Sequence, residues 1–206
     1  MRISSLAALG FLAATLVALP LQGADEPGWI SLFDGKTLTN WKPSESPTSW
    51  KVEDGAIVAL GNRSHLFYTG PEAPFKNFEL KVDVMTEPGA NGGIYFHTEF
   101  LTNNWPKKGY ETQVNISHSD WRKTGSLYGV QDVRELAAQD NKWWVQHIIV
   151  QDKHVTIKID GKTVVDYTEP ATVTGDRKIG QGTFALQAHD PKSVIRYKNI
   201  RVKKLD

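Results

Sequence analysis

HVTIKIDGKTVVDY, residues 154–167, is the stretch that decides the fold class. Branched apolar residues occupy every second position of its first half, at Val155, Ile157 and Ile159. This period of two is typical of a β-strand with one buried face. Asp-Gly follows at 160–161, and alternating strands joined by Asp-Gly indicate a tight hairpin. The stretch therefore predicts two antiparallel strands, with two valines on the returning one.

The same alternation recurs along the rest of the chain. A strand pair is expected in SWKVEDGAIVA, and single strands in NFELKVDVMTE, GGIYFHTEF, YETQVNIS, WWVQHIIV, GTFALQAHD and SVIRYKNIRVKKL. Helical periodicity is weak, and DVRELAAQD at 132–140 allows at most one short helical turn. Many short strands separated by Gly and Asp turns predict an all-β fold, a two-sheet antiparallel sandwich.

Composition narrows the class of protein. The chain has 206 residues, no cysteine and a formal net charge of +1. Without cysteine there are no disulfides, no thiolate nucleophile and no lipid attachment through sulfur. Without a long basic run, nucleic acid is not expected as a partner.

The first residues resemble a signal peptide. Arg2 precedes the apolar run LAALGFLAATLVAL, which is too short to span a bilayer, and small residues follow at Gly23 and Ala24. We therefore expect a signal peptide over 1–24 and one domain over 25–206. The mature chain should be exported to the periplasm or the exterior, should carry no transmembrane segment and should not be a lipoprotein.

Several strands carry unusual polar faces. Side chains two apart on a strand share a face. The faces opposite the apolar ones carry Tyr95, His97 and Glu99; Glu111, Gln113 and Asn115; Gln187 and His189; and Arg196 and Lys198. If these strands lie in one sheet, they form a floor rich in hydrogen-bonding groups, which Trp105, Trp121 and Tyr128 could rim. Such a floor suits a carbohydrate; the alternative is an ordinary solvated face.

The motifs in their order resemble one family. GWISLFDGKTLTNWK at 28–42, NGGIYFHTE at 91–99, GYETQVNISH at 109–118 and FALQAHDPKSVIRYKNIRVKKL at 184–205 are similar to segments of the 3-keto-disaccharide hydrolase family. The resemblance covers nearly the whole chain after the leader. It implies a concanavalin A-like jelly roll of the lectin/glucanase type, with Asp34-Gly35 as a turn above a packed Trp41. The chain departs from the family at His97, where arginine is frequent, and at His189-Asp190, where His-Gly is frequent.

The resemblance also implies a chemistry. A ketone at C3 of a sugar acidifies the C2 proton; a base removes it, the C1 substituent leaves, and water adds back. Glu111 or His189 could be the base, and His97, Arg196 or Lys198 could hold the enolate. Tyr128 or the remaining histidine could serve the leaving group. The catalytic candidates are thus Glu111, His189 and His97, and the substrate-binding candidates are Tyr95, Glu99, Gln113, Trp121, Tyr128, Gln187, Arg196 and Lys198.

Two alternatives stay open at this point. A divalent metal ion could replace the cationic donor at the C3 oxygen, although no spacing of ligands in the sequence requires a cofactor. The same floor could also belong to a non-catalytic, lectin-like glycan-binding module, which would bind sugar without needing a base.

Overall fold

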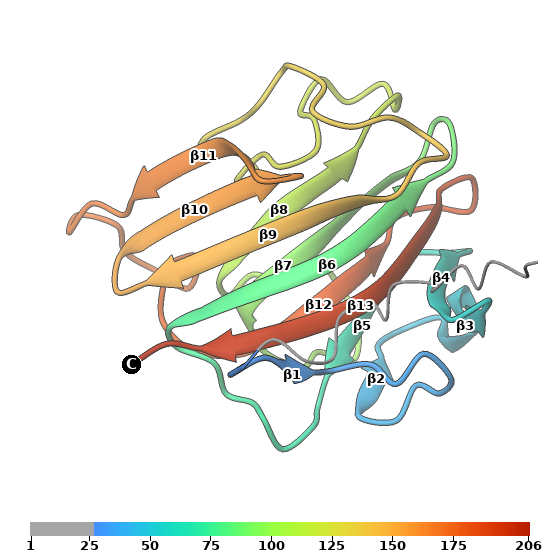
Figure 1. The fold of residues 1–206 in the computed structure, drawn as a ribbon, viewed down its shortest axis with the longest axis horizontal. Coiled ribbons are helices and arrows are strands. Elements are labelled where there is room, and N and C mark those ends of the chain that lie inside the picture. Colours follow the sequence, from blue (N-terminus) through green and yellow to red (C-terminus); the bar gives the residue numbers. More distant parts are fainter. Residues whose placement is uncertain (1–26) are drawn as a thin grey trace, which may run out of the picture.

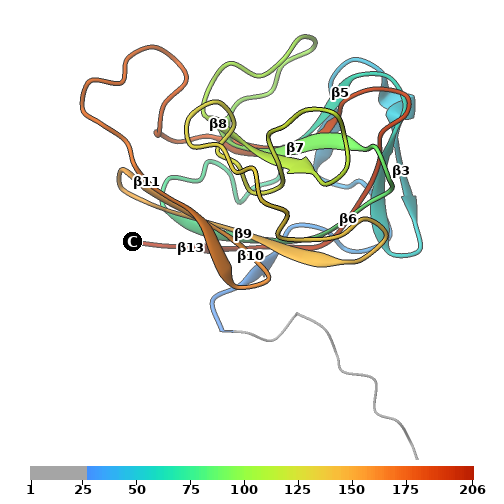
Figure 2. The same cartoon turned by 90° about the horizontal axis from the view of Figure 1, so that it is seen from above.

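Two antiparallel β-sheets pack face to face in the computed structural model, which describes residues 27–206 (Figures 1 and 2). The larger sheet has the order β11-β10-β9-β6-β13-β4-β3. The short strand β1 also belongs to it, and pairs with β13 at Arg201 and Val202, beyond the part of β13 that pairs with β4. Its strands are β1 (Ile30–Ser31), β3 (Trp50–Glu53), β4 (Ala56–Leu60), β6 (Phe78–Thr86), β9 (Trp144–Gln151), β10 (His154–Ile159), β11 (Lys162–Thr168) and β13 (Val194–Lys204).

The smaller sheet has five strands in the order β2-β5-β12-β7-β8. They are β2 (Trp41–Pro43), β5 (Ser64–Tyr68), β7 (Asn91–Thr98), β8 (Tyr110–Asn115) and β12 (Thr183–Ala188). In Figure 2 the loop between β7 and β8 rises from this sheet on the side away from the large sheet. The small sheet thus has one face in the core and one face under loops.

The predicted hairpin is confirmed. β10 and β11 pair antiparallel, with Ile159 opposite Lys162 across the Asp160-Gly161 turn, and a bulge shifts the register after Ile157. Asp160 and Gly161 both have positive φ, 47° and 82°, which is the backbone that a two-residue hairpin turn requires. The strand pair β3–β4 and the other predicted strands are present as well.

The core fills the space between the sheets with alternate residues of each strand. Phe75 and Phe184 stack with ring centroids 4.3 Å apart, and Phe78 meets Phe184 edge-on at 4.9 Å. At Gly92 a Cβ would lie 2.4 Å from Cδ1 of Ile195 in the other sheet. The sheets therefore approach so closely there that no side chain fits.

The opening motif closes one end of the sandwich. The carboxylate of Asp34 accepts hydrogen bonds from the backbone N–H groups of Lys36 and Thr37, and Gly35 has a φ of 74°. Trp41 is buried, and its Nε1 donates to the carbonyl oxygen of Leu32 at 2.8 Å. The expected turn above a packed tryptophan is present.

Two expectations concern helices. Residues 132–140 form a loop and not a helical turn; within 27–206 the one helix is a short 3-10 helix at Pro47–Ser49. The same residues include no helix long and apolar enough to cross a membrane. The expected signal peptide lies outside the described residues.

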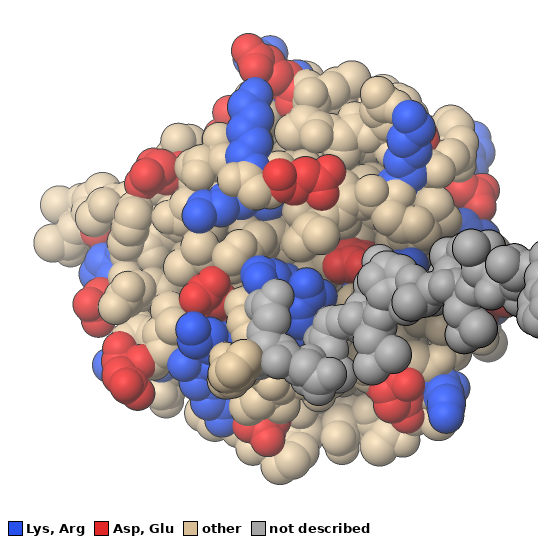
Figure 3. Space-filling view, in the orientation of Figure 1, with Lys and Arg blue, Asp and Glu red and all other residues tan. Residues whose placement is uncertain are grey.

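The outer face of the large sheet carries charges of both signs. In Figure 3 lysine and arginine alternate with aspartate and glutamate over β13, β6 and β9. Arg196 and Glu87 form an ion pair at 2.7 Å, and Nε2 of His147 lies 2.9 Å from Oε2 of Glu79. Charges of both signs therefore lie close together on the visible part of this face.

Candidate functional site

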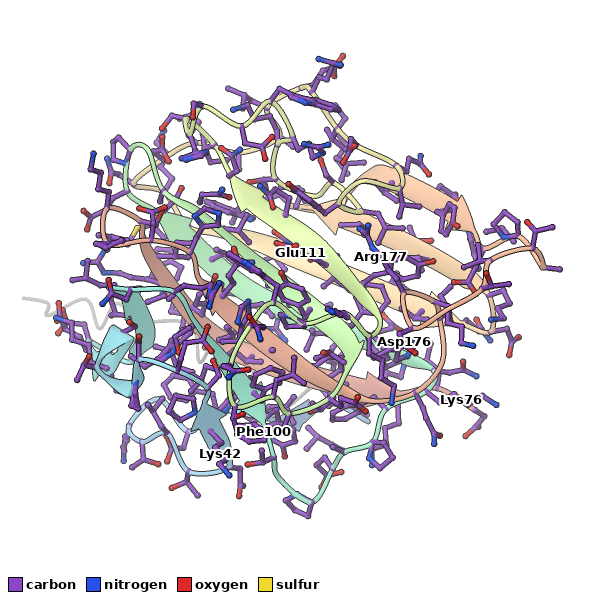
Figure 4. The ribbon with its side chains drawn as sticks, turned by 180° about the vertical axis from the view of Figure 1, so that it is seen from behind. Lys42, Lys76, Phe100, Glu111, Asp176 and Arg177 are labelled. Carbon is purple, nitrogen blue, oxygen red and sulfur yellow. The ribbon has the colours of Figure 1, made fainter. Side chains whose placement is uncertain are left out.

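A pocket of about 500 Å³ opens on the outer face of the small sheet. Figure 4 views this face, with Glu111 on β8 and Arg177 on the neighbouring loop. Its floor comes from β7, β8 and β12, and its walls come from the loops at 99–109, 128–129 and 169–182. The lining residues are Asn91, Tyr95, Trp105, Pro106, Lys107, Gly109, Tyr110, Glu111, Gln113, Tyr128, Arg177, Gln187 and His189.

Glu111 stands at the centre of a hydrogen-bonded triad on the floor. Its register opposite Tyr95 brings the two side chains together across β7 and β8. The Tyr95 hydroxyl donates to Glu111 Oε2 at 2.9 Å, and Gln187 Nε2 donates to Glu111 Oε1 at 3.1 Å and to the Tyr95 hydroxyl at 2.9 Å. The three strands thus fix one carboxylate with two neutral donors.

Gly93 provides the space for this carboxylate. A Cβ built on Gly93 would lie 2.3 Å from Oε1 of Glu111 and 2.8 Å from its Cγ. Because Gly93 lies on β7 between Asn91 and Tyr95 and shares their face, any side chain there would displace Glu111. The glycine in the NGG motif is therefore a requirement of the site.

The environment of Glu111 favours its neutral form. Burial raises the pKa of Glu111 to about 7, and the hydrogen bonds from Tyr95 and Gln187 and the charge of Arg177 only partly oppose this effect. A carboxyl group with such a pKa exchanges a proton readily near neutral pH, which is the property of a general acid or base.

His189 provides a second titratable group in the pocket. Its Nδ1 lies 2.9 Å from Oδ2 of Asp190, which also accepts a hydrogen bond from the Ser193 hydroxyl. Although burial opposes ionisation, the hydrogen bonds from His189, Ser193 and the Lys192 backbone lower the pKa of Asp190. With Nδ1 turned to a carboxylate, Nε2 of His189 is the nitrogen left for other partners.

The remaining walls mix amide, aromatic and cationic groups. Gln113 Nε2 donates to Asn91 Oδ1 at 2.9 Å. Tyr128 is held beside β8 because its backbone N–H donates to the Glu111 carbonyl at 3.0 Å. Arg177 donates to the Tyr128 carbonyl and so closes one side of the pocket. Gln187 Oε1 is buried and has no hydrogen-bond partner among residues 27–206, so the floor presents a free acceptor.

Six of the predicted site residues line this pocket. They are Glu111, His189, Tyr95, Gln113, Tyr128 and Gln187. The sequence prediction did not include Arg177, Lys107 or Asn91. Arg177 and Lys107 lie in loops without periodicity, and Asn91 stands one position before the glycines; alternation from Tyr95 back along β7 could have identified Asn91.

His97 does not lie where its alternation predicted. Its φ of 55° is left-handed and breaks the period of two, so that its ring turns inward against Phe78 and Phe96. There Nε2 donates to the Lys76 carbonyl at 2.8 Å, and Nδ1 accepts from the Gly180 N–H at 3.1 Å. Burial lowers the pKa of His97 to about 4. The residue ties two loops together outside the pocket.

Arg196 and Lys198 lie on the other sheet. The prediction required their strand to join the floor, but β13 pairs with β4 and β6 in the large sheet. Arg196 pairs with Glu87, and Lys198 lies 4.1 Å from the ring centre of Trp143. Alternation predicts which residues of a strand share a face, but not which sheet the strand joins. The prediction for these two residues is therefore wrong.

Glu99 and Trp121 lie outside the pocket as well. Glu99 is exposed and pairs with Lys108 at 3.0 Å. Trp121 is exposed, and the guanidinium groups of Arg122 and Arg134 lie 4.7 and 4.0 Å from its ring centre. Within 27–206 no group of three or more His, Asp or Glu side chains gathers as a metal site.

Comparison of the sequence with known proteins identifies the family of this chain. The profile of the 3-keto-alpha-glucoside-1,2-lyase-like domain matches residues 28–203. A protein of Bacteroides thetaiotaomicron named 3-keto-disaccharide hydrolase is 32% identical over 185 residues, which cover 75% of this chain and 63% of the relative. The chain thus spans less than two thirds of the length of that relative.

Solved structures support the fold. A candidate glycosyl hydrolase of Parabacteroides distasonis superposes with a TM-score of 0.74 at 23% identity, covering 87% of this chain and 94% of the other. A carbohydrate-binding module of Bacillus subtilis superposes with a TM-score of 0.54 at 13% identity, covering 86% and 96%. At these identities the likeness shows a shared sandwich of the concanavalin A type.

Proposed function

The chain belongs to the family of 3-keto-alpha-glucoside-1,2-lyase-like domains, and we propose on this premise that it cleaves 3-keto-glycosides, 3-keto-disaccharides among them. The observation that carries the proposal is Glu111: a carboxyl group on a pocket floor, with a pKa of about 7, beside a histidine and an arginine. The relative named 3-keto-disaccharide hydrolase supports the same substrate class.

Glu111 is the base in this proposal. A ketone at C3 makes the C2 proton acidic, and the Glu111 carboxylate takes that proton while the electron pair moves onto the C3 oxygen as an enolate. The Tyr95 and Gln187 donors hold the carboxylate in one orientation, which places its lone pair in the pocket. A positioned general base contributes about 10²–10⁴-fold to the rate.

In this proposal Arg177 stabilises the enolate and His189 protonates the leaving group. The guanidinium of Arg177 lines the pocket and stabilises the negative charge that develops at the C3 oxygen. The enolate then expels the C1 substituent, breaking the C1–O bond, and Nε2 of His189 protonates the departing oxygen. Water adds to C1 of the enone, Nε2 of His189 takes up the proton that this water loses, and Glu111 returns its proton to C2, so that the net reaction is hydrolysis.

We propose export as well, on the signal-peptide pattern of residues 1–24. N-terminal sequencing of the protein purified from the periplasm or medium should begin between Gly23 and Pro27. A mature protein that starts at Met1 would contradict export without affecting the catalytic proposal.

The test uses Glu111→Gln, which keeps the size of the side chain and removes the base. On a 3-keto-glucoside such as 3-keto-trehalose, kcat should fall at least about 100-fold. In the wild type kcat/KM should rise with pH through about pH 7, because only the carboxylate form of Glu111 accepts the proton. Glu53→Gln, on an exposed carboxylate of β3 in the large sheet, is the matched control and should keep full kcat.

Two outcomes would overturn this assignment. A Glu111→Gln variant with unchanged kcat would move the base to His189, and His189→Asn would then be the variant to lose turnover. A wild-type protein that binds 3-keto-glycosides by calorimetry and releases no sugar from them would be a glycan-binding module of the lectin type.

A further inference from the structure

A second cavity, of about 290 Å³, lies next to the first one on the same face of the molecule. The two cavities share two lining residues, Trp105 and Lys107, which both belong to the loop between β7 and β8. The second cavity also reaches Asp176, the neighbour of Arg177 on the other loop (Figure 4). A ligand longer than one ring could therefore extend from the first cavity past Trp105 into the second.

One residue that lines the second cavity has a buried hydroxyl without a partner. Thr98 is 1% exposed, and its Oγ1 has no hydrogen-bond partner among residues 27–206. The left-handed backbone at His97 turns its ring into the core beside Phe96, and the next residue, Thr98, is among those that line the second cavity. An unpaired buried hydroxyl destabilises a fold, and a ligand hydroxyl that reaches Thr98 would satisfy it.

The other groups of the second cavity suit a neutral polyhydroxylated ligand. Asn103 and Asn104 contribute side-chain amides, and Asp176 contributes a carboxylate. Glu99 and Lys108 pair with each other at 3.0 Å, so that the charges in this cavity are balanced. Trp105 is 38% exposed and offers an indole surface to either cavity. Amides, a carboxylate and an indole together match the hydroxyls and the apolar face of a sugar.

We propose that the second cavity is the binding site for the leaving-group sugar of a 3-keto-disaccharide, with Trp105 as the wall between the two rings. The proposal rests on the function proposed above, because it is the first cavity that holds the keto sugar at Glu111. It makes the protein selective for glycosides whose leaving group is itself a sugar over those with a small alkyl group.

Thr98→Val is the decisive variant, since valine has the same shape and lacks only the unpaired hydroxyl. We expect kcat/KM for 3-keto-trehalose to fall about 3- to 10-fold, the value of one hydrogen bond. The kcat/KM for methyl 3-keto-glucoside should stay unchanged, because its methyl group does not reach the second cavity. Thermal stability should be unchanged or higher, since no hydrogen bond of the free protein is lost. Thr98→Ser, which keeps the hydroxyl, is the matched control and should retain the preference.

An equal loss on both substrates, or no loss on either, would overturn the second cavity as a sugar site. The outcome remains informative if the wild type cleaves neither substrate, in which case the proposed catalysis fails by itself. Calorimetry with the intact keto-disaccharide and the methyl glycoside then measures binding alone. Tighter binding of the disaccharide that disappears in Thr98→Val would still support the subsite, and equal binding of both ligands would exclude it.

Discussion

Glu111 is the residue whose properties differ most from those of an ordinary surface carboxylate. Its folded pKa of about 7 lies above its ordinary value of 4.5, so the folded state holds a proton that the unfolded state releases between pH 4.5 and 7. The free energy of unfolding therefore falls as the pH rises through this range. The residue that we propose as the base thus lowers the stability of the protein at the pH at which it acts.

The stability of Glu111→Gln tests this reasoning. Above pH 7 the variant should be more stable than the wild type, by up to about 3 kcal/mol, because a neutral amide replaces a buried carboxylate. Below pH 4.5 the difference should disappear, since the wild-type residue is then protonated in both states. Urea denaturation at pH 4 and at pH 8 measures both values, and a variant less stable than the wild type at pH 8 would contradict the raised pKa.

At the scale of elements, the loop at 169–182 depends on one buried carboxylate. Glu169 accepts hydrogen bonds from the Tyr110 hydroxyl at 2.8 Å, the Ile179 N–H at 2.6 Å and Lys153 Nζ at 2.7 Å. Tyr110 belongs to β8, the strand of Glu111, while Ile179 belongs to the loop that carries Arg177. Glu169 thus fixes Arg177 relative to the pocket floor without touching the pocket.

Glu169→Ala should release this loop. The free energy of unfolding should fall by about 1–3 kcal/mol, because the Ile179 N–H and the Tyr110 hydroxyl lose their acceptor. Trypsin should cleave faster after Arg177 and Lys178, and kcat/KM on a keto-glycoside should fall as Arg177 loses its position. Glu72→Ala, whose carboxylate forms a more exposed ion pair with Lys204, is the control and should change none of these quantities. Unchanged proteolysis in Glu169→Ala would show that other contacts hold the loop.

The sequence predicts these elements well where a strand obeys its period of two. The phases of β8 and β12 placed Glu111, Gln113, Gln187 and His189 on the face that the pocket occupies, because the pairing is regular over Tyr110–Gln113 and Ala185–Ala188. The phase failed at His97, since a left-handed residue reverses the faces and nothing in the type of residue marks it. Arg177 could not be predicted, because a loop without periodicity is positioned by contacts such as those of Glu169.

At the scale of the whole molecule, two buried histidines lower the stability in acid, opposite in direction to the contribution of Glu111. Burial lowers the pKa of both His65 and His97 to about 4. His65 is fully buried under Trp105 beside Tyr95, and neither of its ring nitrogens has a hydrogen-bond partner within residues 27–206. The unfolded chain binds a proton at each histidine near pH 6.5, whereas the folded chain does so only near pH 4. Each site therefore removes up to about 3 kcal/mol of stability as the pH falls from 6.5 to 4.

His65→Leu should weaken this pH dependence. It removes one of the two titrations, so the urea midpoint should change less between pH 7 and pH 4.5 than in the wild type. His154→Gln, on an exposed histidine of the hairpin, is the control and should keep the wild-type slope. A His65→Leu variant with the full wild-type slope would show that His65 does not carry this effect.

Because the small sheet has one face in the core and one in the pocket, its ligand preference can change while the fold stays the same. Along β8 and β12 residues that face the core alternate with residues that face outward, and the pocket is lined by outward-facing ones, Glu111, Gln113 and Gln187. The residues that face the core determine the fold, and those that face outward determine what the pocket can bind. A gene for this scaffold can therefore acquire a new ligand preference by point changes at alternate codons, while the selection that maintains the fold acts on the codons between them.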